Sequence, residues 1–366
     1  MNVRIELAKA TDDAALRRLL AANAVPGRIT ITYEREPNYF LGCNTMGARY
    51  QVLVARHSEA DVIAVACRTQ RSLFVNGVAT NIGYLGQLRV DERFRGRWLV
   101  SQGFQALRQL HDADPAPAYL LSVIEQNREA FGVLIERRRK HFPSFFALGR
   151  LFTLALPVRR PKPTTTTLEL AHGSLETLPE ISAFLQQHGR TRQFFPAYTL
   201  DDFSDRETTR DFQPEDFVLA YRNGQLAGII GLWDQARYKQ TVVRGYAGWL
   251  RTMRPFYNAV AKLSGRPLLP ALGQEIRYAY ASFVCVADDD AEVFDTLLRQ
   301  TLALAAARGQ SYLMIGLTEC DPLLPIAQRH PHIAYPSRVF LAAWENGKEF
   351  YERLDGRPPY LEIATL

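Results

Sequence analysis

Apolar and polar residues along the chain alternate between the two-residue period of strands and the 3.6-residue period of helices. Near the start, Thr11 precedes a segment in which Leu16, Leu19 and Leu20 recur at helical spacing, which predicts a helix. In this first half, the pattern also predicts strands over 3–7, 50–55, 61–74, 78–90, 119–123 and 145–156, a helix over about 98–111 and another from Asn127.

The second half of the chain repeats this order of elements. Asn76-Gly77 in the first half and Asn223-Gly224 in the second each lie between apolar runs and predict hairpin turns. Asp288–Asp290 suit the start of a helix, because carboxylates accept hydrogen bonds from its free N–H groups. The pattern predicts strands over 168–170, 217–221, 226–233, 276–286, 312–317, 339–344 and 360–363, and helices over 175–188, 291–308 and from Asp321-Pro322.

The segment PVRRPKPTTTT, residues 157–167, is rich in proline and threonine and predicts a linker. It divides the chain into an N-terminal domain, 1–157, and a C-terminal domain, 168–366, with a linker over 158–167. The two halves match in the order of their elements, but the second is longer, so we expect an insertion near 234–274. The predicted fold class is α/β, with a mixed sheet in each domain.

The composition is typical of a globular protein, with 47% hydrophobic and 22% charged residues in a chain of 366. No apolar run reaches the ~18 residues of a transmembrane helix, and Asp12 and Asp13 interrupt the start before a secretory segment forms. We therefore expect a cytoplasmic protein. The four cysteines form no CxxC pair, which predicts free thiols and no metal site.

The net charge of +6 comes partly from two basic clusters, Arg137–His141 and Arg159–Lys162. Such clusters attract phosphate groups, either of a nucleotide cofactor or of nucleic acid. The same clusters are also explained by a solvated helix end followed by a linker. We therefore do not expect nucleic acid as a partner, although the charge allows it.

The stretch RFRGRWLVSQGF, residues 93–104, joins a predicted strand to a predicted helix. The backbone turns sharply there, so unpaired N–H groups at the helix start can bind phosphate. Arg95 and Arg97 would add charge-assisted hydrogen bonds. The alternative interpretation is an ordinary strand–helix junction with a solvent-facing pair of arginines.

Two motifs resemble those of the GCN5-related N-acetyltransferase (GNAT) superfamily. The first is Leu88-x-Val90 followed by Arg95-Gly96-Arg97, and the second is Asn127-x-x-Ala130 after the next strand. The resemblance extends to the order of elements in both halves, as in tandem members of the superfamily. It implies a mixed sheet that splays after its fourth strand, with acyl-coenzyme A (acyl-CoA) bound in the split.

The resemblance also assigns residues to the site. It implies that the pyrophosphate sits on residues 95–100, the thioester carbonyl near 88–90, and the pantetheine arm beside Asn127. The cofactor-binding residues would be Leu88, Arg89, Val90, Arg95, Gly96, Arg97, Trp98, Leu99, Val100 and Asn127. Tyr84, where related proteins often place a base, and Glu125 are the candidates for catalysis.

The sequence departs from the superfamily pattern at three positions. Trp98 and Val100 stand where related proteins have Gly or Ala, which let phosphate oxygens come close to the backbone. Leu134 stands where many members place a tyrosine that protonates the leaving thiolate, and leucine cannot donate a proton. In the second half, Asp288–Asp290 replace the basic turn and would repel a pyrophosphate, so we expect that half to be a degenerate copy.

We therefore expect an N-acyltransferase that moves an acyl group from acetyl-CoA or another acyl-CoA to a small-molecule or peptide amine by direct attack. Three alternatives remain open: a non-catalytic CoA-binding module, aminoacyl transfer from charged tRNA, and a structural interaction protein. The aromatic residues of the insertion, with residues 231–235, would line an acceptor pocket or form a packing layer.

Overall fold

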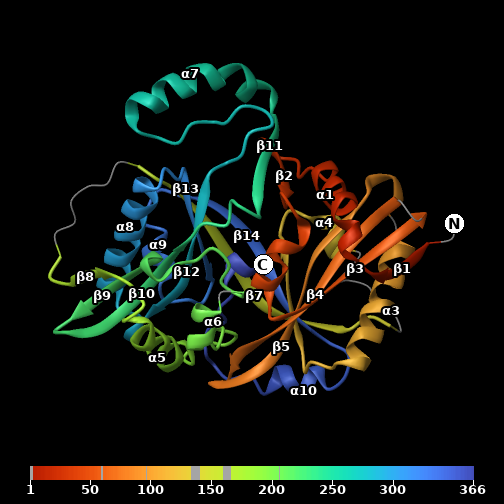
Figure 1. Cartoon of the computed structure of the whole chain (residues 1–366), viewed down its shortest axis with the longest axis horizontal. Helices are drawn as coiled ribbons and strands as arrows, with labels where there is room; N and C mark the ends of the chain where they lie inside the picture. The colour runs from red at the N-terminus through yellow and green to blue at the C-terminus, as the bar shows by residue number, and fades with distance from the viewer. Residues whose placement is uncertain (1–2, 59–60, 96, 133–140, 160–165, 206) are drawn as a thin grey trace.

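One long mixed sheet runs across the whole molecule, from β1 at one edge to β8 at the other (Figure 1). The computed structural model describes residues 3–58, 61–95, 97–132, 141–159, 166–205 and 207–366. The sheet has 12 strands in the order β1-β3-β4-β5-β6-β14-β7-β13-β12-β10-β9-β8. The predicted α/β class with a mixed sheet is confirmed.

The strands of the sheet follow the apolar runs of the sequence closely. First-half strands are β1 (Arg4–Leu7), β3 (Arg49–Ser58), β4 (Asp61–Val75), β5 (Val78–Val90), β6 (Tyr119–Ile124) and β7 (Ser144–Pro157). Second-half strands are β8 (Glu169–His172), β9 (Phe217–Arg222), β10 (Gln225–Trp233), β12 (Tyr278–Val286), β13 (Tyr312–Thr318) and β14 (Ile333–Ala343).

The two halves exchange their last strands. Strand β14 of the second half pairs antiparallel with β6 of the first, and β7 of the first half pairs antiparallel with β13 of the second. The exchanged strands β7 and β14 also pair with each other in the middle of the sheet. The sheet is therefore continuous across the predicted linker, of which residues 160–165 lie outside the described part of the chain.

Helices cover both faces of the sheet (Figure 1). Helix α1 packs against β4 on one face of the first half, and Leu99 and Phe104 of α3 lie in apolar clusters with the same strands from the other face. In the second half, α8 packs against β10 and β9. The helices are α1 (Asp13–Ala22), α2 (Cys43–Met46), α3 (Arg97–Ala113), α4 (Arg128–Ala130), α5 (Leu178–Gly189), α6 (Leu200–Ser204), α7 (Gly248–Ser264), α8 (Ala291–Ala307), α9 (Leu324–Ala327) and α10 (Gly347–Glu352).

A second, two-stranded sheet joins the halves away from the main sheet. It pairs β2 (Ile29–Glu34) with β11 (Gln240–Tyr246), and α7 follows β11 as an arm that projects from the body (Figure 1). The region predicted as an insertion thus supplies β11 and this arm. None of the helices in the described part of the chain is long and apolar enough to cross a membrane.

Most predicted elements agree with the structure, but one predicted strand is absent and strand β11 was not predicted. Asn76 and Gly77 both have positive φ, as do Asn223 and Gly224, which confirms the two hairpin turns. The predicted strand over 360–363 is wrong, because these residues form no strand and end in a single 3₁₀ turn. Strand β2 was missed.

Candidate active site

The parallel strands β5 and β6 separate soon after they meet. They pair only at Gly83 with Tyr119 and at Tyr84 with Leu120, although β5 continues to Val90 and β6 to Ile124. The ends of the two strands therefore diverge and leave a gap in the first half of the sheet. This is the splay after the fourth main-sheet strand that the superfamily resemblance implies.

A β-bulge lies in β5 at the gap. The pairing of β4 with β5 shifts between Val65, opposite Arg89, and Cys67, opposite Gly86. Within the bulge, Gln87 has a φ of 57°, which is uncommon for a residue other than glycine. A bulge turns backbone groups out of the ladder, so it can present an N–H to a ligand at the gap.

The bulge separates a polar face from an apolar face. On the polar face, the Arg89 guanidinium lies 5.9 Å from the ring of Tyr33 in β2 and donates to the Leu88 carbonyl at 2.8 Å. Among the described residues, no carboxylate forms a salt bridge with Arg89. Burial raises the pKa of Tyr33 to about 12. Arg89 of β5 and Tyr33 of β2 thus lie together on this face of the bulge.

Tyr84 lies on the same polar face, next to the bulge. Its ring occupies the space of a side chain at Gly86: a Cβ built there would lie 2.4 Å from the ring, so only glycine fits. Tyr84 also hydrogen-bonds Ser122 of β6, and burial raises its pKa. Because its pKa is raised, Tyr84 keeps its proton at neutral pH and can donate a hydrogen bond, and its role as a base stays a prediction.

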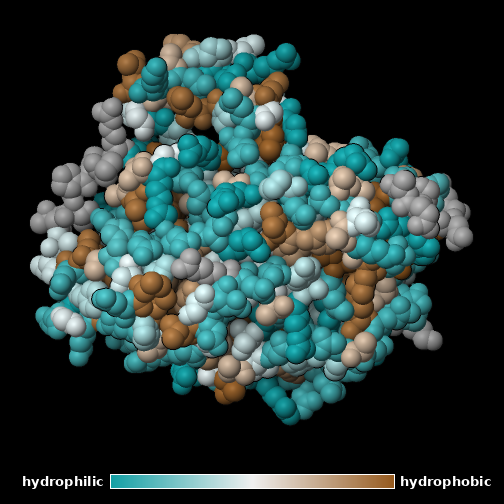
Figure 2. Space-filling model, viewed as in Figure 1, coloured by the Kyte–Doolittle hydropathy of each residue, from teal (hydrophilic) through white to brown (hydrophobic). Residues whose placement is uncertain are grey.

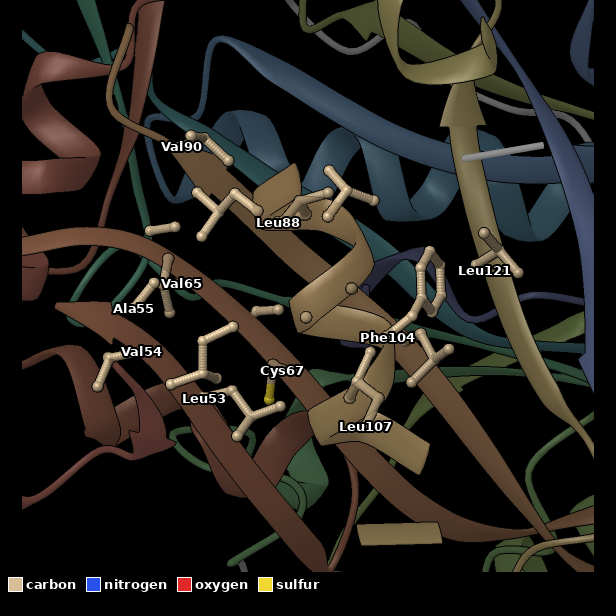
Figure 3. Close-up of a pocket in the computed structure, with 18 residues that line it drawn as sticks. Leu53, Val54, Ala55, Val65, Cys67, Leu88, Val90, Phe104, Leu107 and Leu121 are labelled. Atoms are coloured by element: carbon tan, nitrogen blue, oxygen red, sulfur yellow. The ribbon is translucent and has the colours of Figure 1, made fainter. Parts of the chain in front are cut away.

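The apolar face of the bulge lines a cavity between the sheet and α3 (Figure 3). The cavity has a volume of about 110 Å³, and every residue that lines it is apolar. Gly86 and Leu88 flank Gln87 and both line the cavity. Figure 3 shows Leu53, Val65, Phe104 and Leu107 around the same space. The cavity therefore begins at the bulge and extends beneath α3.

The predicted phosphate-binding turn leads from β5 into α3. Asp91 accepts from the Arg93 backbone and pairs with the Arg93 guanidinium at 2.7 Å, which holds the pKa of Asp91 below its usual range. Arg95 is exposed. Gly96 and the side chain of Arg97 lie outside the described residues.

Helix α3 begins at Arg97, and the departures from the superfamily pattern lie in its first turn. Leu99 is buried and Val100 half-buried, and both line the cavity. The Trp98 side chain is 38% exposed and is not part of the cavity wall. Val100 thus faces the apolar space and not the solvent side of the turn.

The structure gives Glu125 and Asn127 local structural contacts. Glu125 accepts two hydrogen bonds from Arg150 of β7, at 2.7 and 2.8 Å, and lies 3.7 Å from Arg338 of β14. Arg150 holds the pKa of Glu125 below its usual range, which makes it a weak base. The Asn127 side chain caps α4 by accepting from the Ala130 N–H at 3.0 Å. Residues 133–140, with Leu134 and most of one basic cluster, lie outside the described part.

The second half has an equivalent gap, but residues 358–366 occupy it. Strands β12 and β13 pair only over Tyr278–Tyr280 and then separate. The Pro359 carbonyl accepts from Thr318 of β13, and Ile363 packs so closely on Gly316 that a Cβ there would lie 2.2 Å from it. Lys239 donates to the main-chain oxygens of Ala364 and Leu366, and burial lowers its pKa to about 7.

The second half also has an equivalent bulge, and the backbone N–H of that bulge already has a hydrogen-bond acceptor within the chain. Phe283 of β12 has a φ of 56° and lies where the pairing with β10 shifts. Its backbone N–H donates to the buried Glu362 carboxylate at 2.8 Å, and its ring stacks on Trp233. Among the described residues, no side-chain carboxylate accepts from a backbone amide of the first-half bulge.

The helix after the second gap is capped by its own carboxylate. Asp290 accepts from the backbone N–H groups of Glu292 and Val293 and pairs with Arg222 at 2.6 Å. Asp289 forms an ion pair with Arg192. The capping role predicted for Asp288–Asp290 is confirmed for Asp290 alone, because the other two aspartates make no capping hydrogen bond to α8. No group of His, Cys, Asp or Glu among the described residues could hold a metal ion.

Residues 231–235 do not line an open pocket. Leu232 and Trp233 are completely buried, and the Trp233 indole donates to the Arg210 carbonyl at 2.8 Å. Trp249 and Phe256 lie exposed on the α7 arm. The residues that sequence reasoning missed are Gln87, Tyr33 and Glu362, which no motif marks.

This arrangement of strands has counterparts among solved structures. A Saccharomyces cerevisiae N-myristoyltransferase with bound myristoyl-CoA aligns with a TM-score of 0.63 and 10% identity, over 93% of this chain and 79% of that chain. A second structure of that enzyme, also with bound myristoyl-CoA, aligns with a TM-score of 0.62 and 9% identity, over 93% of this chain and 82% of that chain. This chain has the GNAT fold.

The GNAT fold is recognised here through structure and not through sequence similarity. No protein-family model matches the sequence, and no curated protein sequence matches it. A GCN5-related N-acetyltransferase from Kribbella flavida aligns more loosely, with a TM-score of 0.48 and 9% identity over 93% of this chain and 70% of that one.

Proposed function

We propose that the protein is an N-acyltransferase that uses acyl-CoA and acts in the gap of the first half. The observation that carries this proposal is the bulge at Gln87, which lies between a polar face and an apolar cavity at the point where β5 and β6 separate. A thioester placed there would have its carbonyl at the bulge backbone, its acyl chain in the cavity and its acceptor on the polar face.

The CoA moiety would extend from the bulge toward the start of α3. Backbone N–H groups at a helix start have no partners within the helix and favour anions. Arg95 would contact the pyrophosphate, with Gly96 and Arg97 beside it, and the resemblance to GNAT motifs supports this placement. Because Val100 faces the cavity, the remaining obstacle is Trp98, whose exposed indole can turn away from a bound phosphate.

The reaction would be direct attack of a neutral amine on the thioester carbonyl. The N–C bond forms, the C–S bond breaks and the CoA thiolate leaves. The proton lost by the nitrogen passes to solvent, from which the released thiolate is protonated to the thiol. A backbone N–H of the bulge would stabilise the oxyanion. Tyr84, which keeps its proton because of burial, would donate toward the thiolate, whose free thiol has a pKa near ~8.5.

We further propose that the acyl group is longer than acetyl. A dry apolar cavity of ~150 Å³ is large enough to bind benzene, so the 110 Å³ cavity would accept a chain of roughly four to six carbons. Each buried methylene contributes ~0.8 kcal/mol, which is about fourfold in affinity. The acceptor would be a small-molecule or peptide amine, with Arg89 available to bind an anionic group on it.

The cavity can be tested at Gly103 of α3. Gly103 lines the cavity and a Cβ at this position meets nothing within 4 Å, so we expect a larger side chain there to reduce the space. We expect wild-type affinity to rise about fourfold per methylene from acetyl-CoA to hexanoyl-CoA in titration calorimetry. Gly103→Leu would abolish that rise, whereas the matched control Gly103→Ala would leave most of it. Equal affinity for all chain lengths in the wild type would contradict the acyl pocket.

Catalysis needs a separate test, because binding alone fits a CoA-binding module. The protein would be incubated with butyryl-CoA and a panel of peptide and small-molecule amines, and amide products would be detected by mass spectrometry. Product formation that falls at least about tenfold in Tyr84→Phe supports the proposed chemistry. Tight thioester binding with no amide from any amine would establish the non-catalytic alternative instead.

A further inference from the structure

The α7 arm carries an unpartnered apolar stripe. Its members recur at helical spacing along one side of the helix, and all are exposed. Leu263 is 90% exposed, Phe256 65% and Trp249 64%, which is unusual for such large apolar side chains. The stripe consists of Trp249, Met253, Phe256, Val260 and Leu263.

A different side of α7 holds the helix in place. Arg254 and Asn258 donate to the Leu269 carbonyl at 3.1 and 3.0 Å, and Ala261 is buried. Tyr257 donates to the Pro267 carbonyl. These contacts fix α7 against the returning segment 265–272, so the stripe is not the face that the fold itself uses.

The arm stands away from the body. Figure 1 shows α7 beyond the end of β11, and Figure 2 shows apolar side chains gathered on it. The returning segment adds Leu268 and Leu272, which are 47% and 59% exposed. A flat surface could therefore contact the arm without meeting the sheets of the body.

The arm is also strongly basic. Residues 248–274 contain no aspartate or glutamate. Their four basic residues are Arg251, Arg254, Lys262 and Arg266. An exposed apolar stripe with tryptophan on a helix whose charges are all positive is the pattern of a helix that lies in a membrane interface and binds anionic lipids.

We propose that the α7 arm docks this protein on the surface of a membrane that contains anionic lipids. The apolar stripe would enter the interface between headgroups and acyl chains, with Trp249 at the level where tryptophan is favoured. Arg251 and Lys262, both exposed, would stay on the headgroup side. The helix lies on the membrane and does not cross it.

The charges favour lipid over a second copy of the chain. Two arms that met through their apolar stripes would bring together two segments with four positive charges each and no negative charge. Like charges that face each other across an interface oppose association, whereas an anionic surface neutralises them. The inference is independent of the catalytic proposal, since no residue of the arm belongs to the candidate active site.

The test is co-sedimentation of the full chain with vesicles. We expect binding to phosphatidylcholine vesicles that contain phosphatidylglycerol, weaker binding to phosphatidylcholine alone, and loss of binding at high salt. Phe256→Glu should abolish binding, and Arg251→Glu with Lys262→Glu should weaken it by at least roughly 30-fold, from ~1 kcal/mol for each basic residue near an anionic surface. Leu175→Glu is the matched control, because Leu175 is 67% exposed outside the arm.

Further readouts guard against a folding artefact and against self-association. Phe256→Ser should behave like Phe256→Glu, with an unchanged circular dichroism spectrum and melting temperature. Trp249 fluorescence should shift to the blue on addition of anionic vesicles. Binding that survives Phe256→Glu, or that is the same for neutral and anionic vesicles, overturns the proposal. A dimer in lipid-free sedimentation that Phe256→Glu dissociates would assign the stripe to a second copy.

Discussion

The two gaps in the sheet have the same backbone arrangement but differ in the residues that contact the bulge. Each lies where two parallel strands separate, and each has a bulge with a positive-φ residue, Gln87 in the first and Phe283 in the second. In the first gap the bulge faces Tyr84 and an apolar cavity. In the second, Glu362 accepts from the bulge N–H and residues 358–366 fill the space.

This difference supports the proposal that the same backbone arrangement binds a ligand in the first gap and stabilises the core in the second. A bulge N–H needs an acceptor. In the second gap the buried Glu362 side chain accepts from the bulge N–H, so that group is part of the core. In the first gap, no side-chain carboxylate of the described residues does so. The helix starts differ in the same way, since Asp290 caps α8 from within the chain, whereas the turn before α3 contains Arg95 and Arg97.

The largest expected difference is in the unfolding free energy that an alanine substitution costs at each of the two bulges. Phe283 is completely buried in an aromatic cluster with Phe212, Phe217 and Trp233. Phe283→Ala should cost about 3–5 kcal/mol of unfolding free energy, because it leaves a cavity. Gln87→Ala should cost no more than about 0.5 kcal/mol, because Gln87 is half-buried and outside a packed cluster. Urea unfolding measures both, and similar losses would contradict the comparison.

A smaller effect is expected at Glu362. Glu362→Ala leaves the Phe283 N–H and the Tyr360 hydroxyl without their acceptor, at a cost of about 2–4 kcal/mol. Glu362→Gln keeps an acceptor oxygen and should cost less. Chemical denaturation of both variants at neutral pH shows which of them loses more unfolding free energy.

The Glu362→Gln variant also predicts a pH dependence. Burial raises the pKa of Glu362 above the ordinary glutamate value of 4.5, so the native state holds this proton at a pH where the unfolded state has lost it. That stabilisation is complete below about pH 4.5 and is lost as the pH rises through the native pKa. Glutamine does not titrate. The stability advantage of the wild type over the variant should therefore shrink as the pH rises above about 4.5, and a widening difference would exclude a raised pKa.

The smallest expected effect concerns the two helix starts. Asp290→Ala removes the cap of α8 and should cost about 1 kcal/mol, with no effect on acyl-CoA binding. Arg95→Glu changes an exposed residue and should alter stability by no more than about 0.5 kcal/mol. Thermal unfolding without ligand compares them. A large loss of stability in Arg95→Glu would mean that the turn is part of the core.

Local signals explain what the sequence predicted. The hairpins at Asn76-Gly77 and Asn223-Gly224, the cap at Asp290 and the bounds of β5 all depend on neighbouring residues. The motif at 93–104 placed the turn and helix α3 correctly, and the splay follows from the superfamily resemblance. These features needed no knowledge of distant contacts.

Features that depend on distant partners could not be predicted. The apolar runs of β7 and β14 do not specify a partner strand, so the exchange between the halves has no sequence signal. Neither bulge contains a glycine at its positive-φ position, although glycine is the usual marker. The alternation over Tyr360–Ile363 suggested a strand, but these residues enter a gap that only the folded sheet creates. The direction of the Val100 side chain, toward a phosphate or toward the cavity, likewise depends on how α3 packs against the sheet.

The central claim is that one acyl-CoA site exists per chain and that it lies in the first half. The most direct measurement is a calorimetric titration with butyryl-CoA of the wild type, Arg95→Glu and Asp290→Ala. The account predicts one site per chain, loss of binding in Arg95→Glu and unchanged binding in Asp290→Ala. Two sites per chain, or full binding in Arg95→Glu together with loss in Asp290→Ala, would contradict it.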